Sequence, residues 1–156
     1  MNQTVRAIAD LLAEEAVLLG LAAADKASLL AALAQSVTRP VGLTAQAVEK
    51  ALLAREAMGS TGLGAGFALP HARLPGLVRF HALFARLSAP IAFDAIDGAP
   101  VDLVFLLLLP AEDRATALAA LAAIARRMRL PGIAAALRAA PDARAAHAIL
   151  AGQPPA

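Results

Sequence analysis

The stretch that decides the fold is VDLVFLLLLP, which runs from Val101 to Pro110. It is a nearly unbroken run of Leu, Val and Phe with one charged residue, and Pro110 closes it. A continuous apolar run of this length is typical of a strand that is buried on both faces. We therefore expect a central strand over residues 101–109.

Further strands and helices are expected on both sides of this run. Composition predicts strands at Arg79–Leu87, 91–93 and 67–69, and an extended segment at Val17–Leu21. The spacing of apolar residues, with Asp25 and Thr44 as N-caps, predicts helices upstream. These helices cover residues 2–17, 26–37 (ending before Pro40) and 45–58. Downstream helices are expected at 112–129, shortly after Pro131, and at 142–151. The order predicts an α/β fold, a single-domain mixed sheet flanked by helices over residues 1–152, with a disordered tail at 153–156.

Composition limits the classes of function. The chain has 156 residues, 60% of them hydrophobic, which suffices for one domain with a core of its own. The absence of Cys excludes disulfides, thiolate zinc sites and thiol nucleophiles. No metal and no cofactor are expected. The longest uncharged window, Ala57–Ala72, carries four Gly and one Pro, which is unlike a membrane-spanning helix.

Charge does not point to nucleic acid. The formal net charge is only +2, and the one basic cluster, Arg126, Arg127 and Arg129, ends a predicted helix whose dipole it complements. No aromatic residues are interleaved with it for base stacking. The N-terminus lacks a basic region followed by an apolar run, so no cleaved signal is expected. We expect a cytoplasmic protein that neither binds nucleic acid nor inserts into a membrane.

The segment GSTGLGAGFALPHARLPG, residues 59–76, is where function is expected, because five Gly and two Pro favour loops and turns. A P-loop needs Lys followed by Ser or Thr after its last Gly, but Phe67 and Ala68 stand there. A dinucleotide-binding turn needs a strand before its glycines, whereas a helix precedes them here. The remaining interpretation is a loop whose backbone amides approach an anion closely. Its residues are Gly59, Gly62, Gly64 and Gly66, with the hydroxyls of Ser60 and Thr61.

His71 is the candidate nucleophile of this segment. Pro70 restricts its neighbour Leu69 to an extended conformation, which holds the imidazole at the exit of the predicted strand. A His beside a Pro is more often an ordinary loop residue. Arg55 and Arg73 favour a functional role for His71, because they bring cationic groups to the same region, as a transferring phosphoryl group requires.

Two blocks carry a family resemblance. LLAREAMGSTGLGAGFALPHARLPGL, residues 52–77, resembles the active-site signature of phosphotransferase-system enzyme IIA domains of the fructose/mannitol and nitrogen-regulatory type (type 2). IAFDAIDGAPVDLVFLLLLP, residues 91–110, resembles the family's next block. The resemblance implies a mixed sheet flanked by helices, with His71 as the residue that accepts a phosphoryl group from HPr or its nitrogen-branch counterpart. It places Arg55 beside that site and residues 59–66 in the loop around it.

The resemblance leaves three roles open. The sequence carries no fused permease and no Cys-bearing IIB domain, which favours a nitrogen-regulatory phosphocarrier over a sugar-specific (fructose/mannitol) IIA component. A binding regulator that is not phosphorylated is the remaining alternative. The regulated targets and the oligomeric state are not given by the sequence. The expected chemistry is an in-line transfer to neutral His71, assisted by Arg55, by Ser60 or Thr61, and by a carbonyl that fixes the tautomer.

Two departures from the family pattern bear on that chemistry. Many members carry a second active-site His in a His-Leu pair, where Ala117-Leu118 stands here, so we expect Ala117 to face His71 and transfer to be weakened. Ala65 replaces a frequent Asn, which predicts fewer donors around the phosphate. His81 is expected to be a core or surface residue, and His147 to be solvated. The expected apolar rim for docking a small carrier consists of Met58, Leu63, Phe67 and Leu69, each of which could equally be core.

Overall fold

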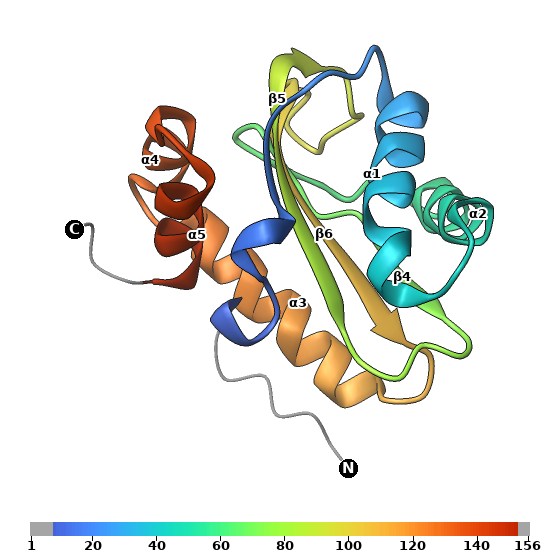
Figure 1. Cartoon of the computed structure of the whole chain (residues 1–156). Coiled ribbons are helices and arrows are strands. Elements are labelled where there is room, and N and C mark those ends of the chain that lie inside the picture. The colour runs from blue at the N-terminus through green and yellow to red at the C-terminus, as the bar shows by residue number, and fades with distance from the viewer. Residues whose placement is uncertain (1–7, 153–156) are drawn as a thin grey trace.

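A mixed six-stranded sheet lies between two layers of helices (Figure 1). This is a computed structural model that describes residues 8–152, with the backbone alone for residues 38–41. The helices are α1 (Lys26–Val41), α2 (Ala45–Ala57), α3 (Arg114–Arg129), α4 (Ile133–Ala139) and α5 (Ala143–Ala151). The strands are β1 (Val17–Leu21), β2 (Gly62–Gly64), β3 (Phe67–Ala68), β4 (His71–Leu74), β5 (His81–Ile91) and β6 (Val101–Pro110). The predicted fold class is confirmed.

Strand β6 organises the sheet. It pairs antiparallel with β5 along one edge and parallel with β3 and then β4 along the other. β1 adds to β5 in parallel, and β2 adds to β3 antiparallel. Every side chain from Leu103 to Leu108 is fully buried, so the predicted central strand is confirmed.

The two faces of the sheet carry separate cores. Side chains alternate along a strand, so Phe105 and Leu107 pack on the side of α3 and α5, whereas Leu106 and Leu108 pack on the side of α1 and α2. Figure 1 shows the two helix layers on opposite sides of β5 and β6. In the described part of the chain, no helix has the length and hydropathy that crossing a membrane requires.

Both predicted N-caps are confirmed. The Asp25 carboxylate accepts the backbone N–H of Ser28 at 2.8 Å, and the Thr44 hydroxyl accepts that of Ala47 at 3.1 Å. Each cap satisfies an N–H that the first turn of its helix leaves without a partner.

Two predicted boundaries are wrong. Helix α1 continues through Pro40 to Val41, because a proline in the last turn removes only one hydrogen bond of the helix. In place of the predicted strands 79–87 and 91–93, one strand, β5, runs from His81 to Ile91, residues 92–93 lie outside it, and its pairing with β6 is irregular between Arg86 and Ile91. Pro90 lies in that interval and has no N–H to donate.

The predicted helix over residues 2–17 is also wrong where it can be compared. Residues 2–7 and the tail 153–156 lie outside the described residues, and Ile8–Asp10 and Glu14–Ala16 form short 3₁₀ turns. The Leu12 carbonyl, which a continuous helix would pair with the Ala16 N–H, instead accepts Nε2 of His147 at 2.7 Å. His147 is therefore half-buried between α5 and the N-terminal segment, rather than solvated as expected.

Candidate functional site

His71 is the first residue of β4, a strand at a place where the sequence predicts a turn. Among the described residues, β4 pairs with β6 alone, and His71 lies opposite Leu107. The strand at this edge of the sheet is interrupted between β3 and β4, because Pro70 has no N–H to donate to the neighbouring strand. Its carbonyl accepts the N–H of Leu107 at 3.0 Å, which keeps the chain in line with β6. His71 thus lies half-buried at an edge of the sheet.

The imidazole of His71 has a defined tautomer. Its Nδ1 lies 2.8 Å from the carbonyl oxygen of Leu69. A carbonyl oxygen only accepts, so Nδ1 carries the proton in the neutral ring. This leaves the lone pair on Nε2, which makes Nε2 the nucleophilic atom.

The pKa of His71 is lowered below its ordinary value near 6.5. Burial is the main cause, and the Leu69 carbonyl opposes it by stabilising the charged ring. Arg55 and Arg73 lower the pKa further, whereas Glu56 raises it. The imidazole is therefore neutral at pH 7.

His71 opens into a surface cavity of about 510 Å³ between α2, β4 and α3. The cavity combines two arginines with apolar side chains, and its lining consists of Ala51, Ala54, Arg55, Met58, His71, Ala72, Arg73, Leu109, Leu118 and Leu121. Met58 and Leu118 are largely exposed, at 83% and 63%. A nucleophile surrounded by exposed apolar groups is accessible to a macromolecular partner.

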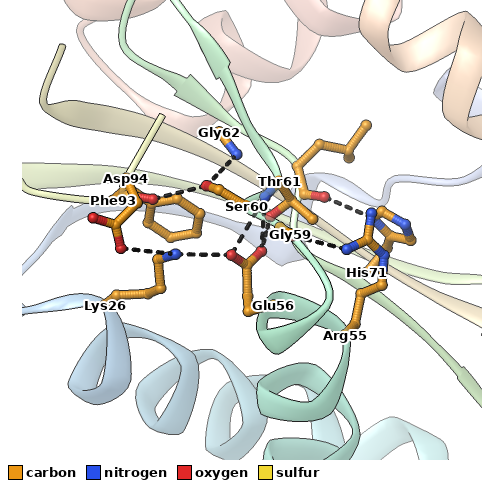
Figure 2. Close-up of polar contacts among 11 residues, drawn as sticks. Lys26, Arg55, Glu56, Gly59, Ser60, Thr61, Gly62, His71, Phe93 and Asp94 are labelled. Atoms are coloured by element: carbon orange, nitrogen blue, oxygen red, sulfur yellow. Dashed lines mark hydrogen bonds and ion pairs between the residues drawn. The ribbon is translucent and has the colours of Figure 1, made fainter. Parts of the chain in front are cut away.

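The predicted arginines share this cavity with His71. Arg55 is in the last turn of α2, and its Nη1 donates to the Gly59 carbonyl at 2.9 Å. Figure 2 shows the Arg55 guanidinium beside the imidazole. Arg73 is exposed two residues along β4, which places its side chain on the same side of the strand as His71.

The hydroxyls of Ser60 and Thr61 point elsewhere. Ser60 Oγ donates to the Phe93 carbonyl at 2.8 Å and accepts the Gly62 N–H at 3.1 Å. The Thr61 side chain is buried and donates to the carboxylate of Glu56. Neither residue lines the cavity of His71, so both hydroxyls hold the loop rather than face the imidazole (Figure 2).

Two glycines of the loop are required for different reasons. A Cβ on Gly62 would lie 2.7 Å from that of Ala95, and Gly66 has a φ of +86°, a backbone conformation that favours glycine. Gly59 contributes the carbonyl that Arg55 binds. Gly64 and Ala65 line a different cavity of about 360 Å³, next to Ile96 and Asp97.

An ionic network beside the site, centred on the buried Glu56, was missed. Glu56 accepts Nζ of Lys26 at 2.9 Å and the backbone N–H of Thr61 at 3.1 Å. Lys26 also lies 3.5 Å from Asp94 and 4.5 Å from the centre of the Phe93 ring. The available signal was the Glu that follows Arg55 in the quoted motif, in a helix whose buried positions are otherwise apolar.

The expectation for the second histidine position is wrong. Ala117 is fully buried in the core between the sheet and α3, and its neighbour Leu118 lines the cavity of His71. Adjacent helix positions differ by about 100° around the axis, so the side chain at 117 faces the core while the side chain at 118 faces the cavity. Ala117 is therefore not positioned to affect transfer at His71.

The structure also places Ala65, the four candidate rim residues and His81. Ala65 is not beside His71, so an absent Asn there removes no donor from that cavity. Among the four expected rim residues, Phe67 and Leu69 are buried and Leu63 lines the other cavity, so Met58 alone lies at the rim. His81 is half-buried opposite Leu108 on the other face of the sheet from His71.

Comparison with known proteins gives consistent matches. Residues 10–152 match the family described as "Phosphoenolpyruvate-dependent sugar phosphotransferase system, EIIA 2". The "Nitrogen regulatory protein" of Bradyrhizobium diazoefficiens is 48% identical over 147 residues, covering 94% of this chain and 96% of that protein. Its namesake in Escherichia coli K12 is 43% identical over 117 residues, covering 74% and 72% of the two chains. The crystal structure of nitrogen regulatory protein IIA-Ntr from Neisseria meningitidis superposes with a TM-score of 0.88 at 34% identity, covering 92% of this chain and 98% of that one.

Proposed function

Since this chain belongs to the EIIA type 2 family of the phosphoenolpyruvate-dependent sugar phosphotransferase system, with nitrogen regulatory proteins among its similar relatives, we propose that it is a regulatory phosphocarrier. In this proposal, Nε2 of His71 accepts a phosphoryl group from the phosphohistidine of an HPr-type carrier or its nitrogen-branch counterpart.

The observation that carries the proposal is the state of His71. Its Nδ1 proton is held by the Leu69 carbonyl, which leaves Nε2 free, and the residue lines a cavity that Arg55 and Arg73 also line. A neutral imidazole with one free nitrogen is the form that attacks phosphorus. Cations beside it stabilise the charge on the phosphoryl oxygens during transfer.

The transfer needs no change in oxidation state. The bond between the donor imidazole and phosphorus breaks as the bond from Nε2 of His71 to phosphorus forms, and the donor nitrogen keeps the electron pair of the broken bond. Bond types are the same on both sides, so the step is close to thermoneutral and reversible. The protein supplies position and positive charge, through Leu69, Arg55 and Arg73.

The regulatory part of the proposal follows from the surface around His71. A phosphoryl group adds negative charge to a cavity rimmed by Met58 and Leu118, which changes the surface that a partner meets. The relatives named above are nitrogen regulatory proteins, and we propose the same kind of role here, in the cytoplasm, toward target proteins that are still to be identified. A sugar-specific IIA component would instead transfer its phosphoryl group to a IIB domain.

The test is phosphorylation of the purified chain. Incubation with enzyme I, the carrier and phosphoenolpyruvate should add one phosphoryl group to the intact mass at neutral pH. His71→Ala should abolish the addition, and the matched control His81→Ala, on the other face of the sheet, should retain it. If neither HPr nor its nitrogen-branch counterpart adds a phosphoryl group, the result would favour the alternative of a binding regulator that is not phosphorylated. Rapid loss of the phosphoryl group to an added IIB domain would favour the sugar-specific component.

A further inference from the structure

Glu56 is a buried carboxylate that does not reach the cavity of His71. Its side chain is 5% exposed. Oε1 accepts both the N–H and the hydroxyl of Thr61, and Oε2 accepts Nζ of Lys26 at 2.9 Å and also shares the Thr61 N–H, at 3.3 Å. Together, these contacts join α1, α2 and the first residues of the glycine loop.

A continuous chain of hydrogen bonds leads from Glu56 to the imidazole. The carbonyl of Thr61 accepts the N–H of Leu69 at 2.9 Å, and the carbonyl of Leu69 accepts Nδ1 of His71 at 2.8 Å. The next residue, Pro70, restricts Leu69 to an extended conformation. The direction of the Leu69 carbonyl is therefore set by the position of Thr61 and by the proline.

Energetics indicate that this network does more than hold two helices together. Burying a carboxylate and an ammonium costs free energy that their mutual attraction only partly returns, and apolar residues of similar size hold helices together as well. An apolar residue at position 56 would, however, leave the N–H and hydroxyl of Thr61 buried without an acceptor. The distinctive contribution of Glu56 is thus to fix Thr61.

We propose that Glu56, held by Lys26, is a positioning residue for His71, acting through Thr61 and the Leu69 carbonyl to keep Nδ1 protonated and Nε2 directed into the cavity. This inference rests on the proposed phosphoryl transfer for its functional meaning. Its geometric content concerns the unphosphorylated protein and is measurable without any donor.

The first readout is the tautomer of His71, measured by two- and three-bond ¹H–¹⁵N correlation spectra of the imidazoles at neutral pH. The wild type should show a proton on Nδ1 only. Glu56→Gln should give a mixture of tautomers. Its amide NH₂ accepts no hydrogen bond, so the side chain cannot bind both the Lys26 ammonium and Thr61 as the carboxylate does, and Thr61 is then less firmly positioned. Phosphoryl acceptance should fall about ten- to a hundredfold through loss of position. The carrier concentration at half-maximal rate should not change, because Glu56 is buried outside the cavity.

Thr61→Val separates position from charge and also covers the case in which Glu56→Gln fails to fold. It removes the hydroxyl contact, keeps the shape of the side chain and leaves the charge of Glu56 in place. It should shift the tautomer in the same direction, by a smaller amount. The matched control is Asp102→Asn, which breaks the pair with Arg138 on the other side of the loop and should leave the His71 spectrum as in the wild type.

The outcomes distinguish the two proposals. One contradicting outcome combines two results: Thr61→Val keeps the wild-type tautomer, and Glu56→Gln changes only the pKa of His71. Glu56 would then act on His71 as a distant charge, and the proposal that it positions the imidazole would be overturned. Wild-type tautomers and rates in both variants would overturn it as well. A wild type that accepts no phosphoryl group contradicts the proposed function, while the spectra still decide whether Glu56 positions His71.

Discussion

Arg55 makes two contributions from one side chain, because its guanidinium faces the cavity of His71 while it donates to the Gly59 carbonyl. A planar fork binds two phosphoryl oxygens at once, whereas an ammonium is a single point charge. At the scale of single residues, this geometry makes the site sensitive to the shape of the cation as well as to its charge.

Arg55→Lys should therefore reduce the rate of phosphoryl acceptance about ten- to a hundredfold, the equivalent of one hydrogen bond to a charged group. The free energy of unfolding should change little, because Lys also donates to exposed carbonyls. The measurement is the initial rate by intact mass, with Arg126→Lys, an exposed residue in the last turn of α3, as control. An unchanged rate would assign the role to Arg73.

Ala65 is strained by its backbone, with φ of +55° in the left-handed region. Such a conformation costs a residue with a Cβ about 1–2 kcal/mol, and glycine avoids the cost at the expense of greater freedom when unfolded. Ala65→Gly should thus raise the free energy of unfolding by about 0.5–1 kcal/mol, measured by urea denaturation. Ala119→Gly, at an exposed position within α3, should lower it by a similar amount. A lower stability for both variants would contradict this account of Ala65.

At the scale of the element, α3 presents one stripe to the core and another to the cavity. Its buried positions are Ala117, Ala120, Ile124 and Met128, and Leu118 and Leu121 lie beside His71. The stripe to which a residue belongs decides whether it can take part in the proposed phosphoryl transfer.

Leu118→His should place an imidazole at the site and raise the phosphorylated fraction at equilibrium with the carrier about ten- to a hundredfold in ratio, because a hydrogen bond to a charged group contributes about 1.5–3 kcal/mol. Ala117→His should instead lower the free energy of unfolding by about 1–3 kcal/mol, because it overfills a closed core. Phosphorylation equilibria and urea curves of both variants are the measurement. A higher phosphorylated fraction in Ala117→His than in Leu118→His would reverse the assignment of the two stripes.

At the scale of the whole molecule, two histidines link stability to pH. Burial lowers the pKa of both His71 and His81, and Arg79 adds to the effect at His81. The unfolded chain then binds protons at a higher pH than the folded one, so the free energy of unfolding should fall as the pH drops below about 6.5. Urea curves between pH 7.5 and pH 5 test this, and the double variant His71→Gln, His81→Gln should show a shallower decline. Stability that stays constant or rises on acidification would contradict it.

The sequence predicted those features that depend on local chemistry. Residue types at short spacing predict the N-caps Asp25 and Thr44 and the buried strand 101–109. They also predict that Arg55 lies close to His71. β4 was missed, because a four-residue edge strand flanked by Pro carries no periodic signal and exists only through its pairing with β6. The stripe error in α3 has a different origin. The motif gave the position along the helix to within one residue, whereas the direction of a side chain requires the rotation to be known as well.

The pairing of β6 also determines the order in which the strands of the sheet can assemble. During synthesis the chain emerges from its N-terminus, so β3 and β4 leave the ribosome before residues 101–110, the only strand that pairs with β4 and the parallel partner of β3 in the described structure. β1 and β5, by contrast, can meet as soon as residue 91 is free. The segment that contains His71 therefore cannot pair until a strand thirty residues downstream has emerged, and the proposed nucleophile is among the last parts of the sheet to reach its place.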